Sequence, residues 1–211
     1  MAVDLLWNRA ASSLATILLA HGAGGAMDSP WMTTMAGLLA DRGIQVARFE
    51  FAYMAGRRSG VRKPPPRGDS LVGEFRDAVA AVSERPLLIG GKSMGGRVAS
   101  LVADDLHAAG DVAGLVCLGY PFHPLGKPEQ LRTAHLASLS TPTLICQGTR
   151  DAFGTREEVA DYNLSGSITM EWLEDGDHDL RPRKAVSGFT HAQHLATTAD
   201  AIVAFAARIS R

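Results

Sequence analysis

A serine enclosed by glycines is the first candidate for chemistry in this sequence. Residues 91–95 read GKSMG and fit the pattern G-x-S-x-G. In that pattern, a sharp turn from strand to helix lifts a nucleophilic serine hydroxyl above a parallel sheet. Glycine is needed on both sides because a side chain there would collide with the neighbouring strand and helix. We therefore take Ser93 as the candidate nucleophile.

The same stretch partly resembles a phosphate-binding loop of the pattern G-x-x-x-x-G-K-[ST]. Residues 91–93 would supply its last three positions, and its first glycine would then fall on Pro86. Proline has no backbone N–H to give to a phosphate, which disfavours a nucleotide site. A plain glycine-rich turn, whose serine only caps the next helix, stays open at this point.

An aspartate and a histidine with suitable positions follow later in the chain. A nucleophilic serine needs a base that takes its proton and a carboxylate that orients the base. Asp151 and His178 each come a few residues after an apolar, strand-like run. The chain order serine, aspartate, histidine is that of α/β hydrolases. The sequence therefore predicts a triad of Ser93, Asp151 and His178, with Asp177 and Asp179 as solvated turn residues.

Acyl transfer also requires two N–H donors for the oxyanion that forms on the attacked carbonyl. We expect one from the amide of Met94, at the start of the helix that follows the serine. The other is expected from the glycine-rich turn at 21–25, with Ala23 as first choice and Gly24 as second. Residues near strand ends are expected at a substrate pocket: His21, Phe122, His123 and Lys92. His21 also fits a buried role in holding the glycine turn.

Strands and helices alternate around these residues. Apolar, strand-like runs are expected at 16–20, 44–51, 87–89, 112–118, 143–147 and 168–173, with a short edge strand near 3–7. Continuous apolar strands separated by amphipathic helices are typical of a parallel sheet covered on both faces. Reactive groups collect at the carboxyl ends of such strands. A loop is predicted at 53–68 and a short helix at 128–137.

Length and composition are those of an ordinary globular protein. For 211 residues with 46% hydrophobic and 20% charged side chains, a single α/β domain over 1–211 is expected. A net charge of −1 gives no reason to expect nucleic acid or an anionic membrane as partner. Cys117 and Cys146 lie in apolar runs, which favours buried free thiols and a cytoplasmic location. No basic segment precedes the apolar run at 14–20, so no signal peptide is expected.

Together these motifs resemble a family of small predicted α/β hydrolases that is similar to the dienelactone hydrolase group. The resemblance implies the α/β-hydrolase fold, with about six to seven mainly parallel strands, helices on both faces and the Ser93–His178–Asp151 triad. Dienelactone hydrolases use a cysteine nucleophile, so Ser93 departs from their pattern. Few residues separate 118 from 143, where this fold inserts its lid, so no large lid is expected. The resemblance rests on 21–25, 91–97, 119–124, 147–151 and 176–178.

Two functions follow from these observations. The first is a serine hydrolase that cleaves small ester, thioester or related acyl bonds without a cofactor or metal, as a monomer or a homodimer. The alternative is a non-catalytic interaction protein that keeps the fold, because the resemblance extends to scaffolding domains of chromatin-associated complexes. The basic residues of the 53–68 segment suit an acidic substrate group or a solvated loop: Arg57, Arg58, Arg62, Lys63 and Arg67.

Overall fold

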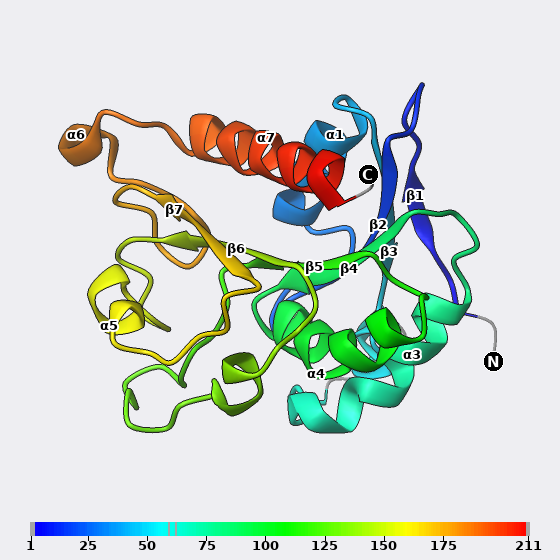
Figure 1. Cartoon of the computed structure of the whole chain (residues 1–211), viewed down its shortest axis with the longest axis horizontal. Coiled ribbons are helices and arrows are strands. Elements are labelled where there is room, and N and C mark those ends of the chain that lie inside the picture. Colours follow the sequence, from blue (N-terminus) through cyan, green and yellow to red (C-terminus); the bar gives the residue numbers. More distant parts are fainter. Residues whose placement is uncertain (1–2, 59, 62, 210–211) are drawn as a thin grey trace.

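The computed structural model describes residues 3–58, 60–61 and 63–209. Over these residues, a sheet of seven strands runs through the molecule in the order β1-β3-β2-β4-β5-β6-β7 (Figure 1). β1 is antiparallel to β3, and all other neighbouring strands pair in parallel. The mainly parallel sheet of the predicted α/β-hydrolase fold is thus confirmed. The strands are β1 (Leu6–Asn8), β2 (Ala15–Ala20), β3 (Ile44–Phe49), β4 (Leu87–Lys92), β5 (Gly114–Leu118), β6 (Thr143–Gly148) and β7 (Ile168–Leu173).

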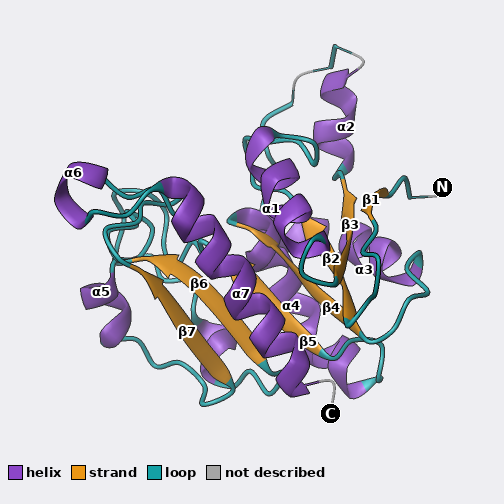
Figure 2. Cartoon of the chain, turned by 90° about the horizontal axis from the view of Figure 1, so that it is seen from above, coloured by secondary structure: helices purple, strands orange, loops and turns teal. Residues whose placement is uncertain are grey.

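Helices cover both faces of the sheet (Figures 1 and 2). α1 and α7 pack together on one face, and α3 and α4 pack together on the other. The connections carry only the smaller helices, and no large lid is present over the described residues. The helices are α1 (Pro30–Ala40), α2 (Ala52–Arg58), α3 (Val72–Ala80), α4 (Met94–Ala108), α5 (Arg156–Ala160), α6 (Lys184–Ser187) and α7 (His191–Ile209), with single 3-10 turns η1 (Gly68–Leu71) and η2 (Ala134–Ala137).

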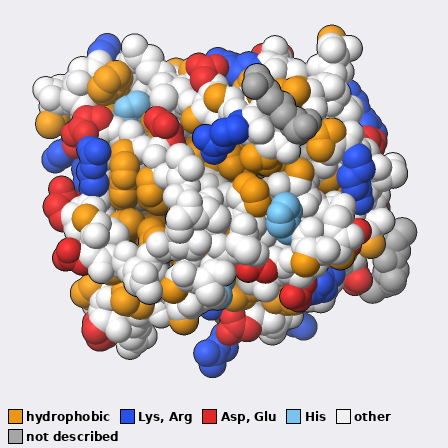
Figure 3. Space-filling view, in the orientation of Figure 1, with side chains coloured by type: hydrophobic (Ala, Val, Ile, Leu, Met, Phe, Trp, Pro, Cys, Tyr) orange, Lys and Arg blue, Asp and Glu red, His pale blue; other side chains and the backbone are white. Residues whose placement is uncertain are grey.

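The sheet divides the hydrophobic core into two halves. Side chains alternate along β2, so that Leu18 packs with the residues of α3 and α4, while Ile17 and Leu19 pack with those of α1 and α7. Because side chains pack on both faces, the sheet is a rigid support for the loops at the carboxyl ends of its strands. Cys117 and Cys146 are buried as free thiols, as predicted. Side chains of both charges are interspersed over the face shown in Figure 3.

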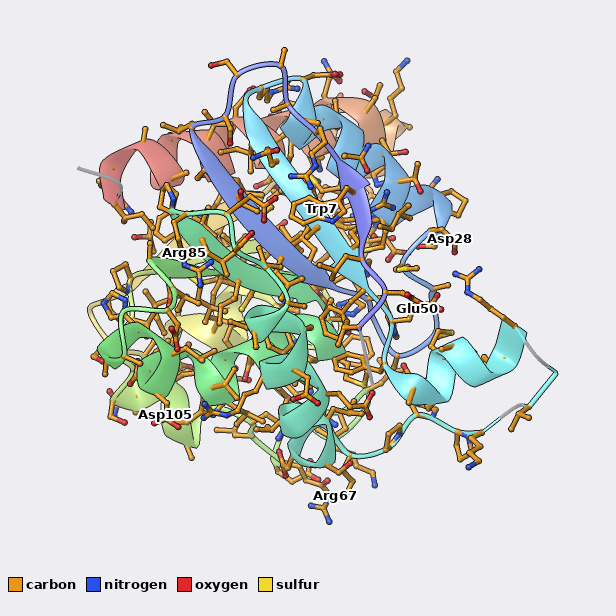
Figure 4. The ribbon with its side chains drawn as sticks, turned by 90° about the vertical axis from the view of Figure 1, so that its right-hand side faces the viewer. Trp7, Asp28, Glu50, Arg67, Arg85 and Asp105 are labelled. Carbon is orange, nitrogen blue, oxygen red and sulfur yellow. The ribbon has the colours of Figure 1, made fainter. Side chains whose placement is uncertain are left out.

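The segment predicted as a loop at 53–68 contains a helix, so this prediction is wrong in part. α2 stands away from the sheet, and Figure 4 shows Asp28 and Glu50 between it and the rest of the molecule. Arg58 in its last turn pairs with Glu50 at 2.7 Å and with Asp28 at 3.0 Å. Tyr53 is buried against the main core. These contacts stabilise α2, which is too short to show a clear helical pattern in the sequence. Arg62, which belongs to the same predicted loop, lies outside the described residues.

Of the helix predicted at 128–137, only the single turn η2 is present. Its first half follows another path because the Arg132 amide donates to the Phe122 carbonyl at 2.7 Å instead of closing a helical turn. A capping box begins α5: Thr155 accepts from the Glu158 amide, and the Glu158 carboxylate accepts from the Thr155 amide. Over the described residues, every helix is too short or too polar to cross a bilayer.

Candidate active site

Ser93 occupies the turn between the end of β4 and the start of α4. Its backbone has φ 51° and ψ −117°, a conformation that residues with a Cβ rarely adopt. This turn projects the hydroxyl beyond the carboxyl edge of the sheet. The predicted strand–serine–helix arrangement is therefore present, with the strain that such a turn imposes.

The glycines around Ser93 are required by the close approach of β2, β4 and α4. A Cβ on Gly91 would lie 2.5 Å from the Ala20 carbonyl oxygen, and one on Gly95 would lie at the same distance from that atom. A Cβ on Gly96 would lie 2.7 Å from the Gly91 carbonyl oxygen. Real Cβ atoms do not approach backbone so closely. The glycines thus let the helix begin directly against two strands.

The predicted triad residues form one continuous chain of hydrogen bonds. Ser93 Oγ lies 2.8 Å from His178 Nε2, and His178 Nδ1 lies 2.8 Å from Asp151 Oδ2. An ionised carboxylate only accepts hydrogen bonds, so Nδ1 carries the proton that His178 donates to Asp151. Nε2 is then left as the acceptor for the serine hydroxyl. Asp151 is fully buried, whereas the His178 side chain keeps 22% of its surface exposed.

Two residues that support Asp151 and His178 were not predicted from the sequence. Gln147, at the end of β6, donates from Nε2 to Asp151 Oδ2 at 2.9 Å, and its Oε1 accepts from the Tyr120 amide at 2.7 Å. The Phe153 amide donates to Asp151 Oδ1 at 2.9 Å, and its ring lies 4.3 Å from the His178 ring, centre to centre. The only sequence signal for Gln147 is a polar residue that ends an apolar strand.

Gln147→Leu is expected to reduce turnover and stability together. The leucine would remove a donor from Asp151 and leave the buried Tyr120 amide without its acceptor. We expect kcat/KM for an ester to fall about ten- to a hundredfold and the free energy of unfolding to fall by about 1–3 kcal/mol. Thr143→Val is the control, because Thr143 is a buried donor on the same strand that bonds the Thr141 carbonyl. It should lose stability but keep kcat/KM; an equal loss of kcat/KM in both variants would contradict a positioning role for Gln147.

Lys92 connects the turn at Ser93 to the loop that carries His178. Its ammonium group pairs with Asp179 at 2.7 Å and donates to the His178 carbonyl at 3.3 Å. Burial opposes ionisation of Asp179, but the hydrogen bond and charge of Lys92 prevail and lower its pKa below the usual value. The Trp31 indole also donates to the Asp179 carbonyl at 3.0 Å. The sequence neighbours of His178 thus hold the loop, and Asp151 orients the ring.

A hollow of about 800 Å³ opens beside Ser93, and we call it the larger hollow. It lies between the glycine turn after β2, the start of α1, the His178 loop and the start of α7. Lys92, one of the residues expected at a substrate pocket, borders it. Its walls combine apolar and polar groups, among them Trp31, Met32, Phe153, His178, Arg181 and Leu195.

The residues expected to bind an oxyanion lie next to Ser93. Ala23 and Gly24 border the larger hollow, and Met94 begins α4. Among the described residues, neither the Ala23 amide nor the Met94 amide has an acceptor. The Tyr53 hydroxyl donates to the Ala23 carbonyl at 3.0 Å and fixes this turn. Burial raises the pKa of Tyr53 to about 12, so the hydroxyl keeps its proton.

Three residues expected at the pocket are part of the core instead. His21 is buried, where its Nε2 accepts from the Phe51 amide at 3.2 Å and its Nδ1 donates to the Gly22 carbonyl. Burial lowers the pKa of His21, which fits this neutral tautomer. Phe122 packs against the Tyr120 ring, and His123 is buried beside it. Their backbone lies near strand ends, but their side chains turn inward.

The described residues bring together no group of three or more histidine, cysteine, aspartate or glutamate side chains that could hold a metal ion.

Comparisons with known proteins identify the family and the fold of the chain. The chain resembles a lid-less α/β serine hydrolase from Xanthomonas campestris, with a TM-score of 0.68, 20% identity and coverage of 98% of this chain and 88% of that one. It also resembles a dienelactone hydrolase from Anabaena variabilis, with a TM-score of 0.70, 19% identity and coverage of 96% and 91%. At these identities the likeness is one of fold. The profile of a family described as an alpha/beta hydrolase domain matches residues 13–207. The chain therefore belongs to the alpha/beta hydrolase domain family.

Proposed function

We propose that this protein is a serine hydrolase that cleaves small esters, thioesters or related acyl bonds. The observation that carries the proposal is the hydrogen-bond chain from Ser93 through His178 to the buried Asp151. Each contact has the length expected of a nucleophile, a base and an orienting carboxylate ready for reaction. The strained turn at Ser93 supports the same role, because strain of this kind persists where function requires it.

In the first step, His178 Nε2 takes the Ser93 hydroxyl proton while Oγ forms a bond to the acyl carbon. The carbonyl oxygen becomes an oxyanion, which the amides of Met94 and Ala23 would bind. When this intermediate collapses, the bond from the acyl carbon to the leaving oxygen or sulfur breaks. The leaving group takes the proton from His178, and the acyl group stays on Ser93.

In the second step, a water molecule gives its proton to His178 and attacks the acyl carbon. Collapse breaks the bond to Ser93 Oγ, which recovers the proton from His178 and releases the acid. Asp151 stays ionised throughout and stabilises the imidazolium in both steps. These steps use only groups of the chain, the substrate and water.

Labelling with a fluorophosphonate probe tests the nucleophile, and esters test turnover. We expect the probe to label the wild-type protein but not Ser93→Ala, and 4-nitrophenyl esters of short acids to be hydrolysed in a way that His178→Ala abolishes. Equal labelling of both proteins would contradict the proposal. Absence of labelling and of turnover in well-folded protein would instead favour the non-catalytic interaction protein.

A further inference from the structure

A second hollow, of about 450 Å³, borders Ser93 on the side of α4. Three arginines from separate segments border it, so we call it the arginine hollow. Arg67 precedes η1 and extends outward at the edge of the molecule in Figure 4. Arg97 lies in the first turn of α4, and Arg132 lies in the connection between β5 and β6. Ala23, Ser93 and Phe153 border both this hollow and the larger one.

Positive charge exceeds negative charge in the arginine hollow. Arg97 pairs with Asp69 at 2.9 Å, but its buried Nε donates to no described residue. Burial, followed by the positive charge of Arg97, lowers the pKa of Arg132. No described carboxylate forms an ion pair with Arg67 or Arg132, and Asp69 acts on Arg132 only from a greater distance.

Contacts within the fold hold two of these arginines, Arg97 and Arg132, in place. Gly68 packs so closely on Arg97 that a Cβ there would lie 2.5 Å from the Arg97 Nη1. The hydroxyl of the buried Tyr120 donates to the Arg132 carbonyl at 3.0 Å and fixes the backbone at Arg132. Like charges in a partly buried space repel, and an anion between them would remove this cost. A guanidinium fork also matches the two oxygens of a carboxylate.

The position of the base decides which part of a substrate reaches the arginine hollow. His178 must protonate the leaving group, so the leaving oxygen has to lie on its side of Ser93. Among the described residues, His178 borders the larger hollow and is absent from the walls of the arginine hollow, whereas Met94 borders the latter. The acyl chain then runs from Ser93 along the first turn of α4 toward Arg97.

From this geometry we infer that the arginine hollow binds a negative charge at the far end of the acyl chain. The substrate class is then the monoester of a short dicarboxylic acid, or an acyl group with an equivalent anionic end. The inference rests on the proposed function, because the role of His178 in that function determines on which side of Ser93 the leaving group and the acyl chain lie. It also assigns Arg97 and Arg132 to specificity and not to bond cleavage.

Two esters with the same leaving group and the same acyl length test the inference. 4-Nitrophenyl hexanoate is neutral, and the mono-4-nitrophenyl ester of adipic acid adds a terminal carboxylate. After subtraction of the rate without enzyme, we expect the wild-type kcat/KM to be about tenfold or more higher for the adipate ester. Arg132→Gln should lower this ratio about tenfold. Arg208→Gln removes the same charge from an exposed position on α7 and should leave the ratio unchanged.

The outcomes separate the inference from the proposed function. Ser93-dependent labelling and hydrolysis of hexanoate, with no preference for the adipate ester, would overturn the inference and leave the hydrolase in place. A preference that Arg208→Gln lowers as much as Arg132→Gln would also overturn it, because net charge alone would then explain the effect. If Arg132→Gln fails to fold, Arg67→Gln at an exposed position gives the same test. Absence of labelling and of turnover would overturn both proposals.

Discussion

Ser93→Gly is expected to abolish ester turnover and still be more stable than Ser93→Ala. Both variants lose the nucleophile, so kcat/KM should fall by about 10⁴-fold or more. The alanine keeps the φ of 51° that costs a residue with a Cβ about 1–3 kcal/mol. Glycine adopts this conformation without that cost, although it gains entropy in the unfolded chain. We expect a net advantage for glycine of about 1 kcal/mol.

Chemical denaturation of the two variants measures this difference. At an ordinary position glycine is less stable than alanine by about 0.5–1 kcal/mol, so the expected order is reversed. The same comparison at Ser70, an exposed residue of η1 whose φ is not positive, should show the ordinary order. If Ser93→Gly were the less stable variant, the turn would store no strain.

Gly95→Ala is expected to cause a large loss of stability. The new Cβ would lie 2.5 Å from the Ala20 carbonyl oxygen and 2.7 Å from that of His21. Both atoms belong to backbone, so β2 and α4 must move apart. We expect the free energy of unfolding to fall by about 3 kcal/mol or more, together with a large loss of labelling at Ser93.

Gly37→Ala gives the matched control for this substitution. Gly37 lies within α1, where a Cβ would meet no atom within 4 Å. Alanine there should raise the free energy of unfolding by about 0.5–1 kcal/mol, because it favours the helix. Thermal and denaturant unfolding of both variants check the pair. A loss below 1 kcal/mol for Gly95→Ala would contradict the close packing of strand and helix.

The strands and the triad residues were accessible to sequence analysis because their signals are local. Continuous apolar runs identify buried strands, and each triad residue follows such a run by a few positions. Since parallel strands share one carboxyl edge, their order along the chain was enough to predict that Ser93, Asp151 and His178 approach one another. The structure places them within hydrogen-bond distance.

Features that depend on side-chain direction could not be predicted in this way. His21, Phe122 and His123 have backbone near the site, yet their side chains pack into the core. Gln147 supports Asp151 through a contact that no spacing rule describes. Arg67, Arg97 and Arg132 come from three segments, and only tertiary packing places them around one hollow.

The absence of a large lid over the described residues also affects the fate of the acyl group that the proposed reaction would leave on Ser93. An enzyme that closes over its intermediate excludes water and can pass the acyl group to another acceptor. Here the His178 side chain keeps 22% of its surface exposed beside the nucleophile. Bulk water, at far higher concentration than any alcohol or amine, therefore meets the intermediate first. The open edge of the sheet thus favours hydrolysis over transfer between acceptors.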